Sequence, residues 1–246
     1  MGSFFSKYYF GGPFETFDVP HLITLGVILG GNLLLFAYRA HFTDKARRWF
    51  RLSLAVVLIL CQLAWIIWLI VVGEATLERL VPLQLCPLFV FLSAVMLITR
   101  SYSIYEYAYF LGGGGAIHAL ISPDIGMYGF PHFIFLQTML LHGCLLTTQV
   151  YMTVIEGFRP TWRSYIRCFL GANLYIGIVF LINFLTGSNY LFLMQKPEFP
   201  NLLEVFGTFP WYIFGIEVVS ILTSLILYFP FAFIDCRQKV NIQKAD

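Results

Sequence analysis

Charged residues are scarce in this sequence: Asp, Glu, Lys and Arg make up 11% of its 246 residues, whereas 59% are hydrophobic. Soluble domains contain about 25% charged residues, so this shortage excludes an ordinary water-soluble protein. The net charge of +2 comes from 15 basic and 13 acidic residues. Such a balanced total does not indicate nucleic-acid binding. No polar stretch is long enough for an aqueous domain, so we predict a single membrane domain over residues 1–246.

Cysteine is also sparse, with five residues in the chain, all in or beside apolar segments. This placement argues against a disulfide framework. Helical metal sites normally carry ligands at i and i+3 or i+4, and no two histidines have that spacing. A zinc site would need ligands from three separate helices. We therefore expect no metal and no other cofactor.

Apolar segments dominate what is present, and seven of them approach the roughly 20 residues that a membrane-spanning helix needs. The expected spans are residues 20–38, 51–73, 82–99, 105–121, 131–155, 166–186 and 210–233. The predicted fold is an all-α polytopic bundle of seven transmembrane helices. Four consecutive glycines, 112–115, weaken the segment 105–121 as a helix, and they favour contact with neighbouring helices over contact with lipid.

Basic residues are concentrated in alternate connections between these spans, in residues 39–51, at Arg100, and in residues 159–167 and 237–244. Because such residues mark the cytoplasmic side, we expect the N-terminus outside and the C-terminus in the cytoplasm. The first 18 residues are rich in Phe and Tyr and are expected to lie at the membrane interface. Either a bacterial plasma membrane or a eukaryotic endomembrane is compatible with this pattern.

Ionisable residues within the spans lie mainly in the half predicted to face outside. His21, Cys86 and His132 fall in the first two turns of their helices, and His142 lies about 16 Å along its helix. Intramembrane ionisable groups are costly to insert and often functional. We therefore predict a pocket that opens to the extracytoplasmic or lumenal side. The alternative is that each of these residues is a neutral, hydrogen-bonded packing residue.

Cys86 is expected near the amino end of the helix 82–99, where the helix dipole favours a thiolate. A histidine from a neighbouring helix, His142 or His132, would complete a minimal pair of nucleophile and base. This predicts a cysteine-dependent enzyme. The alternative is a lipid- or solute-binding transporter or sensor that uses the same pocket without covalent chemistry. No internal repeat supports a transporter.

Several strings resemble a known family: Leu85-Cys86, Phe130 to Phe133 with Phe135 to Gln137 and His142, Asn183 with Gly187 to Leu191, and Pro210 to Tyr212. They resemble the YwaF-like integral membrane proteins, a group similar to the eukaryotic transmembrane protein 164 family. That family consists of seven-helix lipid acyltransferases thought to use a cysteine nucleophile. The likeness covers about residues 80–215.

The resemblance implies a phospholipid acyltransferase or transacylase in which Cys86 forms a thioester. The family role fits His142 as the base, whereas the predicted depth places His132 nearer Cys86. Gln84 and Pro87 stand where many relatives have His and Asp, a difference that would weaken activation of the thiol. Membrane phospholipids would be both donor and acceptor, although hydrolysis of the thioester would begin with the same step.

The remaining polar and aromatic residues of the predicted pocket are expected to contact substrate. Asn189 and the amides at helix starts would bind an oxyanion or a phosphate, and Glu217 would orient a histidine. The full set is His21, Gln84, His118, Gln137, Asn183, Asn189, Tyr190, Trp211, Tyr212 and Glu217. The sequence leaves the oligomeric state open.

Overall fold

The computed structural model describes residues 4–196 and 205–243, with residues 235–243 as backbone alone. Within these ranges the regular elements are all helical, which confirms the all-α class. The α-helices are α1 (Val19–Ala37), α2 (Asp44–Val71), α3 (Leu77–Leu80), α4 (Leu85–Thr99), α5 (Tyr102–Tyr107), α6 (Gly114–Ile121), α7 (Phe133–Val154), α8 (Trp162–Thr186) and α9 (Trp211–Gln243). Shorter segments are η1 (Arg39–His41), the π-helical η2 (Ala108–Gly113) and η3 (Tyr190–Phe192).

Six helical segments of the described chain are long and apolar enough to cross a membrane, rather than the seven expected. They are 19–37, 44–71, 77–99, 133–154, 162–186 and 211–234. The difference is the predicted span 105–121, where α5, η2 and α6 follow one another without a gap. The π-helical turns of η2 interrupt the α-helix just before and within the glycine run, so no single helix of spanning length forms.

Helix starts differ from the hydropathy boundaries because polar caps extend helices beyond their apolar stretches. Helix α2 begins at Asp44 rather than at residue 51, and the Thr43 hydroxyl caps it by accepting from Ala46 N. Helix α8 begins at Trp162 rather than at residue 166, after a capping box of Thr161 and Ser164. Such caps satisfy amides that have no partner within the helix.

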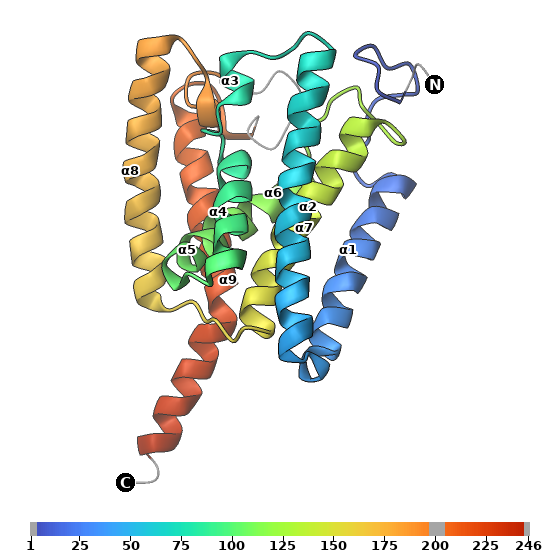
Figure 1. Cartoon of the computed structure of the whole chain (residues 1–246). Helices are drawn as coiled ribbons and strands as arrows, with labels where there is room; N and C mark the ends of the chain where they lie inside the picture. Colours follow the sequence, from blue (N-terminus) through green and yellow to red (C-terminus); the bar gives the residue numbers. More distant parts are fainter. Residues whose placement is uncertain (1–3, 197–204, 244–246) are drawn as a thin grey trace.

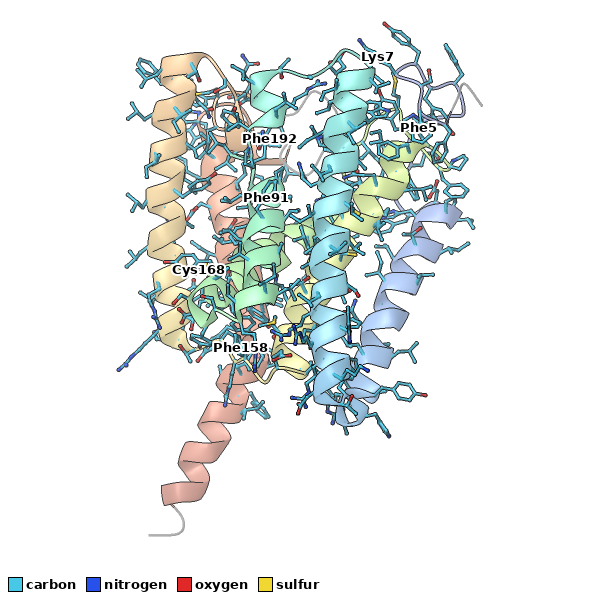
Figure 2. The ribbon with its side chains drawn as sticks, in the orientation of Figure 1. Phe5, Lys7, Phe91, Phe158, Cys168 and Phe192 are labelled. Carbon is cyan, nitrogen blue, oxygen red and sulfur yellow. The ribbon has the colours of Figure 1, made fainter. Side chains whose placement is uncertain are left out.

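The spans are arranged as a bundle with two distinct ends (Figure 1). One of them, the N-terminal end, holds residues 4–18 and the connections 72–84, 122–132 and 187–196. The opposite, basic end holds the connections 38–43, 100–101 and 155–161. In Figure 2, Lys7 and Phe5 mark the N-terminal end and Phe158 the basic end. Connections predicted to share a membrane side therefore do share an end of the bundle; the orientation of the bundle in a membrane stays a prediction.

Residues 4–18 form an N-terminal strap that packs over its end of the bundle. The carbonyls of Phe4 and Phe5 accept hydrogen bonds from Phe133 N (2.9 Å) and Trp68 Nε1 (3.0 Å). Gly129 N donates to the carbonyl of Gly12, and a Cβ on Gly129 would lie 2.9 Å from that same oxygen. Only glycine permits so close an approach of two backbones. The aromatic N-terminal segment is thus part of the packed structure.

Candidate functional site

Cys86 occupies the first turn of α4, as expected, although the helix begins at Leu85 and not at Pro82. Gln84 is the N-cap residue and makes no side-chain cap. The first intrahelical bond runs from Leu88 N to Gln84 O (3.1 Å). The amides of Leu85 and Cys86 precede that bond and point out of the helix end, where the helix dipole is positive. The thiol is free and half-buried beside the main core.

His142 lies buried in α7 with its ring held in one orientation. Its Nδ1 stands 2.7 Å from the carbonyl oxygen of Thr138, one turn earlier. A carbonyl only accepts hydrogen bonds, so the proton of a neutral ring is on Nδ1. The lone pair is then on Nε2, for which no partner is found within the described chain. A ring in this state can take up a proton at Nε2.

A contact deeper in the bundle joins α4 and α7, the helices that carry Cys86 and His142. Gln149 Nε2 of α7 donates to the Ser93 hydroxyl of α4 (3.4 Å), and both residues are buried. Helices α4 and α7 pack together, and both run from the N-terminal end towards the basic end. Cys86 and His142 each precede their contact residue by seven positions, or about two turns and 10.5 Å. Each therefore lies about two turns before the contact, on the face of its helix that carries it, and no described contact joins the Cys86 thiol to the His142 ring.

His132, in contrast, has both ring nitrogens engaged at the N-terminal end. Nδ1 accepts from Ile134 N (3.1 Å) and so caps α7, which leaves Nε2 to donate to the carbonyl of Ser6 (3.0 Å). The ring is fully buried and stacks on Tyr128, with centroids 4.4 Å apart. Burial lowers its pKa, which favours the neutral ring that this arrangement requires.

The two other histidines of the predicted pocket are also hydrogen-bonded within the protein. His21 is fully buried, with Nδ1 accepting from Phe17 N (3.0 Å) and Nε2 2.7 Å from the carbonyl of Leu120. Nε2 of His118, in α6, lies 2.8 Å from the hydroxyl of Thr223 in α9. Through Leu120 and Thr223, these rings join α1 and α9 to α6.

Polar residues of the Asn183–Leu191 string form a brace around the start of α4. Asn183 Oδ1 accepts from Tyr190 N, and its Nδ2 donates to Tyr190 O, both at 2.9 Å. Gln84 Oε1 accepts from Leu191 N (2.9 Å). Asn189 N donates to Glu78 Oε1 (3.0 Å), which ties the string to α3. The brace fixes the backbone immediately before Cys86.

The predicted residues of α9 are divided between buried and exposed positions. Tyr212 is buried and donates its hydroxyl to the carbonyl of Phe192 (2.6 Å), close to the brace. Trp211 is largely exposed. Glu217 accepts from Asn173 Nδ2 of α8 (3.0 Å), and no described contact joins it to a histidine. Gln137 of α7 is buried and donates to the carbonyl of Cys61 in α2 (3.3 Å).

A small apolar cavity of about 140 Å³ lies between η2, α7 and α9. Leu146, Gln149 and Thr153 contribute to its wall from α7. These residues follow His142 by 4, 7 and 11 positions, which places all four on one face of the helix. The buried Oε1 of Gln149 has no hydrogen-bond partner among the described residues. This cavity was not predicted from the sequence, although the helical spacing from His142 was a usable signal.

Among the described residues, no group of three or more His, Cys, Asp and Glu side chains is placed to hold a metal ion. The model of the TMEM164 family matches residues 16–228 of the chain. No curated protein and no solved structure matches the chain.

Proposed function

The chain belongs to the TMEM164 family, and on that premise we propose that it is a membrane-embedded phospholipid acyltransferase or transacylase with Cys86 as nucleophile. His142 is the proposed base. The match confirms the resemblance to the transmembrane protein 164 family; the YwaF-like part of that resemblance stays a prediction. The N-terminal end of the bundle is proposed to face outside or into the lumen, and the pocket predicted from the sequence is proposed to open on that side.

The single observation that carries the proposal is the position and tautomer of His142. Its Nδ1–H is held by the carbonyl of Thr138, so Nε2 is the free acceptor, about two turns before the contact between Gln149 and Ser93 of the helix that carries Cys86. A general base must carry a lone pair and must be oriented by a further group. His132 is also held in place but lacks a free lone pair, because its Nδ1 accepts from Ile134 N and its Nε2 donates to Ser6 O. The geometry therefore favours His142 between the two candidates.

In the proposed first step, His142 Nε2 takes the proton of the Cys86 thiol and the sulfur attacks the acyl carbonyl of a donor phospholipid. The resulting oxyanion would be stabilised by the free amides of Leu85 and Cys86 at the positive end of α4. The ester C–O bond then breaks. The leaving lysophospholipid oxygen receives the proton from His142, and the acyl group stays on sulfur as a thioester.

In the second step, the hydroxyl of an acceptor lysophospholipid gives its proton to His142 Nε2 and attacks the thioester. The C–S bond breaks, and the Cys86 sulfur regains a proton from His142. Water in place of the acceptor would make the protein a lipid hydrolase by the same route. The donor and acceptor phospholipids are the proposed partners, and the scheme needs no cofactor.

The apolar cavity is the proposed site for part of the acyl chain. It begins one turn beyond His142 on the same face of α7 and is lined mainly by apolar side chains such as Leu146 and Leu227. Apolar ligands occupy such cavities because burial removes their surface from water or from polar groups. Four residues predicted to contact substrate are proposed instead to position the start of α4, because their polar atoms form the brace around it. They are Gln84, Asn183, Asn189 and Tyr190.

Comparison of four variants tests this function in phospholipid nanodiscs supplied with a lysophospholipid acceptor. We expect Cys86→Ala to abolish transfer of a labelled acyl chain and His142→Ala to lower it by about 10²–10⁴-fold. Cys144→Ala, which removes another free thiol, and His132→Asn should retain most transfer per folded molecule. Transfer that persists in Cys86→Ala would refute the covalent scheme. Specific lipid or solute binding without turnover would favour the alternative of a transporter or sensor.

A further inference from the structure

The basic end holds a second cavity, of about 340 Å³, and the residues that line it are all charged. It lies on the far side of the bundle from the start of α4. The residues that line it are Asp44, Arg47, Arg48, Arg51, Arg100 and Glu156. None of them takes part in the proposed acyl transfer.

The sequence places these residues together by two routes. Asp44, Arg47, Arg48 and Arg51 have the spacing i, i+3, i+4 and i+7, so they share one face in the first two turns of α2. Arg100 ends α4 in the left-handed region, with φ 56° and ψ 35°. A non-glycine residue rarely adopts this conformation. Here it accompanies an ion pair between Arg100 Nη2 and Glu156 Oε2 (2.8 Å).

Glu156 already serves several donors and cannot neutralise the cavity. Its side chain is 2% exposed, pairs with Arg100, and accepts from the Tyr151 hydroxyl (2.7 Å). The Nε of Arg51 is 3.5 Å from Glu156 Oε1; it is buried and has no hydrogen-bond partner among the described residues. One buried donor at the cavity wall therefore lacks an acceptor, and a buried unpaired donor is costly.

The charges of the lining do not cancel. Four guanidinium groups face two carboxylates, which leaves two positive charges in excess. Arg48 is exposed and makes no ion pair or hydrogen bond within the described chain, so its guanidinium is available to a ligand. Two other arginines use some of their N–H groups in hydrogen bonds within the protein. Arg47 Nε donates to the carbonyl of Phe42, and Arg51 Nη1 donates to the carbonyl of Leu97.

We propose that this cavity binds a phosphomonoester. A phosphomonoester carries about −1.5 to −2 charges at neutral pH and three strong acceptor oxygens, which matches the excess charge and the unpaired donor. A phosphodiester carries a single charge and would leave the cavity positive. Guanidinium groups suit this ligand because their planar fork can donate two parallel hydrogen bonds to phosphate.

The ligand chemistry can come from a lipid headgroup or from a free phosphomonoester. The cavity lies next to the apolar part of α2, which continues from Leu52 towards the other end of the bundle. That location suits a headgroup whose acyl chains lie along the helices. The glycerol phosphate of phosphatidic acid contains the same phosphomonoester, so the two sources can be compared directly.

Binding to the detergent-solubilised full chain tests the proposal with three probes: dioctanoyl phosphatidic acid, dioctanoyl phosphatidylglycerol and glycerol 3-phosphate. The two lipids have the same acyl chains. The phosphate is a monoester in phosphatidic acid and a diester in phosphatidylglycerol. We expect phosphatidic acid to bind about tenfold more tightly than phosphatidylglycerol, as one extra charged contact would give. Binding of glycerol 3-phosphate with equal strength would identify a free phosphomonoester as the source, whereas much weaker binding would identify the lipid.

Two variants of opposite sign make the test specific. Arg48→Gln should reduce the preference for phosphatidic acid to about twofold, and Asp44→Asn should strengthen binding of the monoester by several fold. Both side chains are exposed, so we expect both variants to fold like the native chain. Arg163→Gln, at an exposed position outside the cavity, is the matched control and should bind like the native chain. Equal binding of the two lipids, or an unchanged preference in Arg48→Gln, would overturn the proposal.

Discussion

At the N-terminal end of the bundle, buried polar side chains are matched by neutral backbone groups, whereas at the basic end they are matched by charges. His132 illustrates the first arrangement, with its two ring nitrogens on the backbone of Ile134 and Ser6. Glu156 illustrates the second, with Arg51 and Arg100 as partners. The difference teaches what each end can offer a ligand. A satisfied neutral network fixes geometry, whereas an incompletely balanced charged cluster can bind an ion.

Replacement of Glu156 by Gln should give the largest loss of stability, because it leaves Arg51 and Arg100 without their shared counter-ion. We expect a loss of about 3 kcal/mol in the free energy of unfolding, towards the lower end for a broken buried pair since Arg100 is half exposed. Unfolding in detergent–denaturant mixtures measures this change. Glu15→Gln, which removes an exposed carboxylate at the other end, should be nearly neutral. Equal effects of the two variants would contradict the contrast between the ends.

Replacement of His132 by Ala should cost about 2 kcal/mol, because the cap on Ile134 N and the bond to Ser6 O are both lost. The same unfolding assay reports it. His132→Asn keeps a side-chain oxygen that can cap the helix, so it should recover about half of the loss. No recovery would mean that ring packing, rather than the cap, dominates at this position.

Acid should weaken the same contact. Burial lowers the pKa of His132 in the folded protein below its ordinary value of 6.5, so the unfolded chain binds the proton more readily. The contribution to stability is therefore complete above pH 6.5 and is lost as the pH falls below that value. Unfolding measured between pH 7.5 and 5 should show this decline, and His132→Asn should reduce it. An identical decline in the variant would assign it to other groups.

Replacement of Gln84 by Ala removes the acceptor of Leu191 N and should cost about 1 kcal/mol. Hydrogen exchange gives the sharper measurement, because the amide of Leu191 should exchange faster. The amide of Tyr190, held by Asn183 Oδ1, is an internal reference and should change less. Gln84→Glu preserves an acceptor and should protect Leu191. If the amides of Leu191 and Tyr190 exchanged faster by the same factor, the effect of Gln84 would not be specific to its hydrogen bond with Leu191 N.

The smallest effect is expected at the partly exposed pair of Lys7 and Glu74, which joins the N-terminal strap to the residues just after α2. The hydrogen bond and charge of Lys7 lower the pKa of Glu74, so the pair contributes above the ordinary pKa of the carboxyl and is lost as the pH falls through its lowered value. Glu74→Gln should accelerate proteolysis of the strap slightly at low salt. At high salt the difference should vanish, since ions screen exposed pairs.

The apolar spans were predictable because lipid requires about 20 apolar residues, and 20–38 and 131–155 agree with α1 and α7 within two residues at each end. The polar turns that extend some helices beyond these apolar stretches were not predictable, since hydropathy reports only the part of a helix that contacts lipid. The turns before residue 51 and before residue 166 depend on side-chain caps at Thr43 and Thr161. The π-helical η2 depends on packing around the glycines, with Phe89 against Gly112 and Gln149 against Gly113.

The candidate site was predictable in its residue types but not in its partners. The position of Cys86 in the first turn of α4 is confirmed, whereas the choice between His132 and His142 needed the structure. Ser6 and Thr138, which decide the proton positions of the two rings, act through their backbone carbonyls. A backbone carbonyl has no signature in the sequence. The catalytic roles themselves stay a proposal.

The central claim is that Cys86 carries the acyl group, and intact-mass spectrometry of the protein after incubation with a donor phospholipid in the absence of an acceptor tests it most directly. We predict a mass increase equal to one acyl chain, removed by neutral hydroxylamine as expected for a thioester, in the native chain and in Cys144→Ala. The increase should be absent from Cys86→Ala. An adduct of the same mass on Cys86→Ala, or no adduct on a native chain that turns over the donor lipid, would contradict the account.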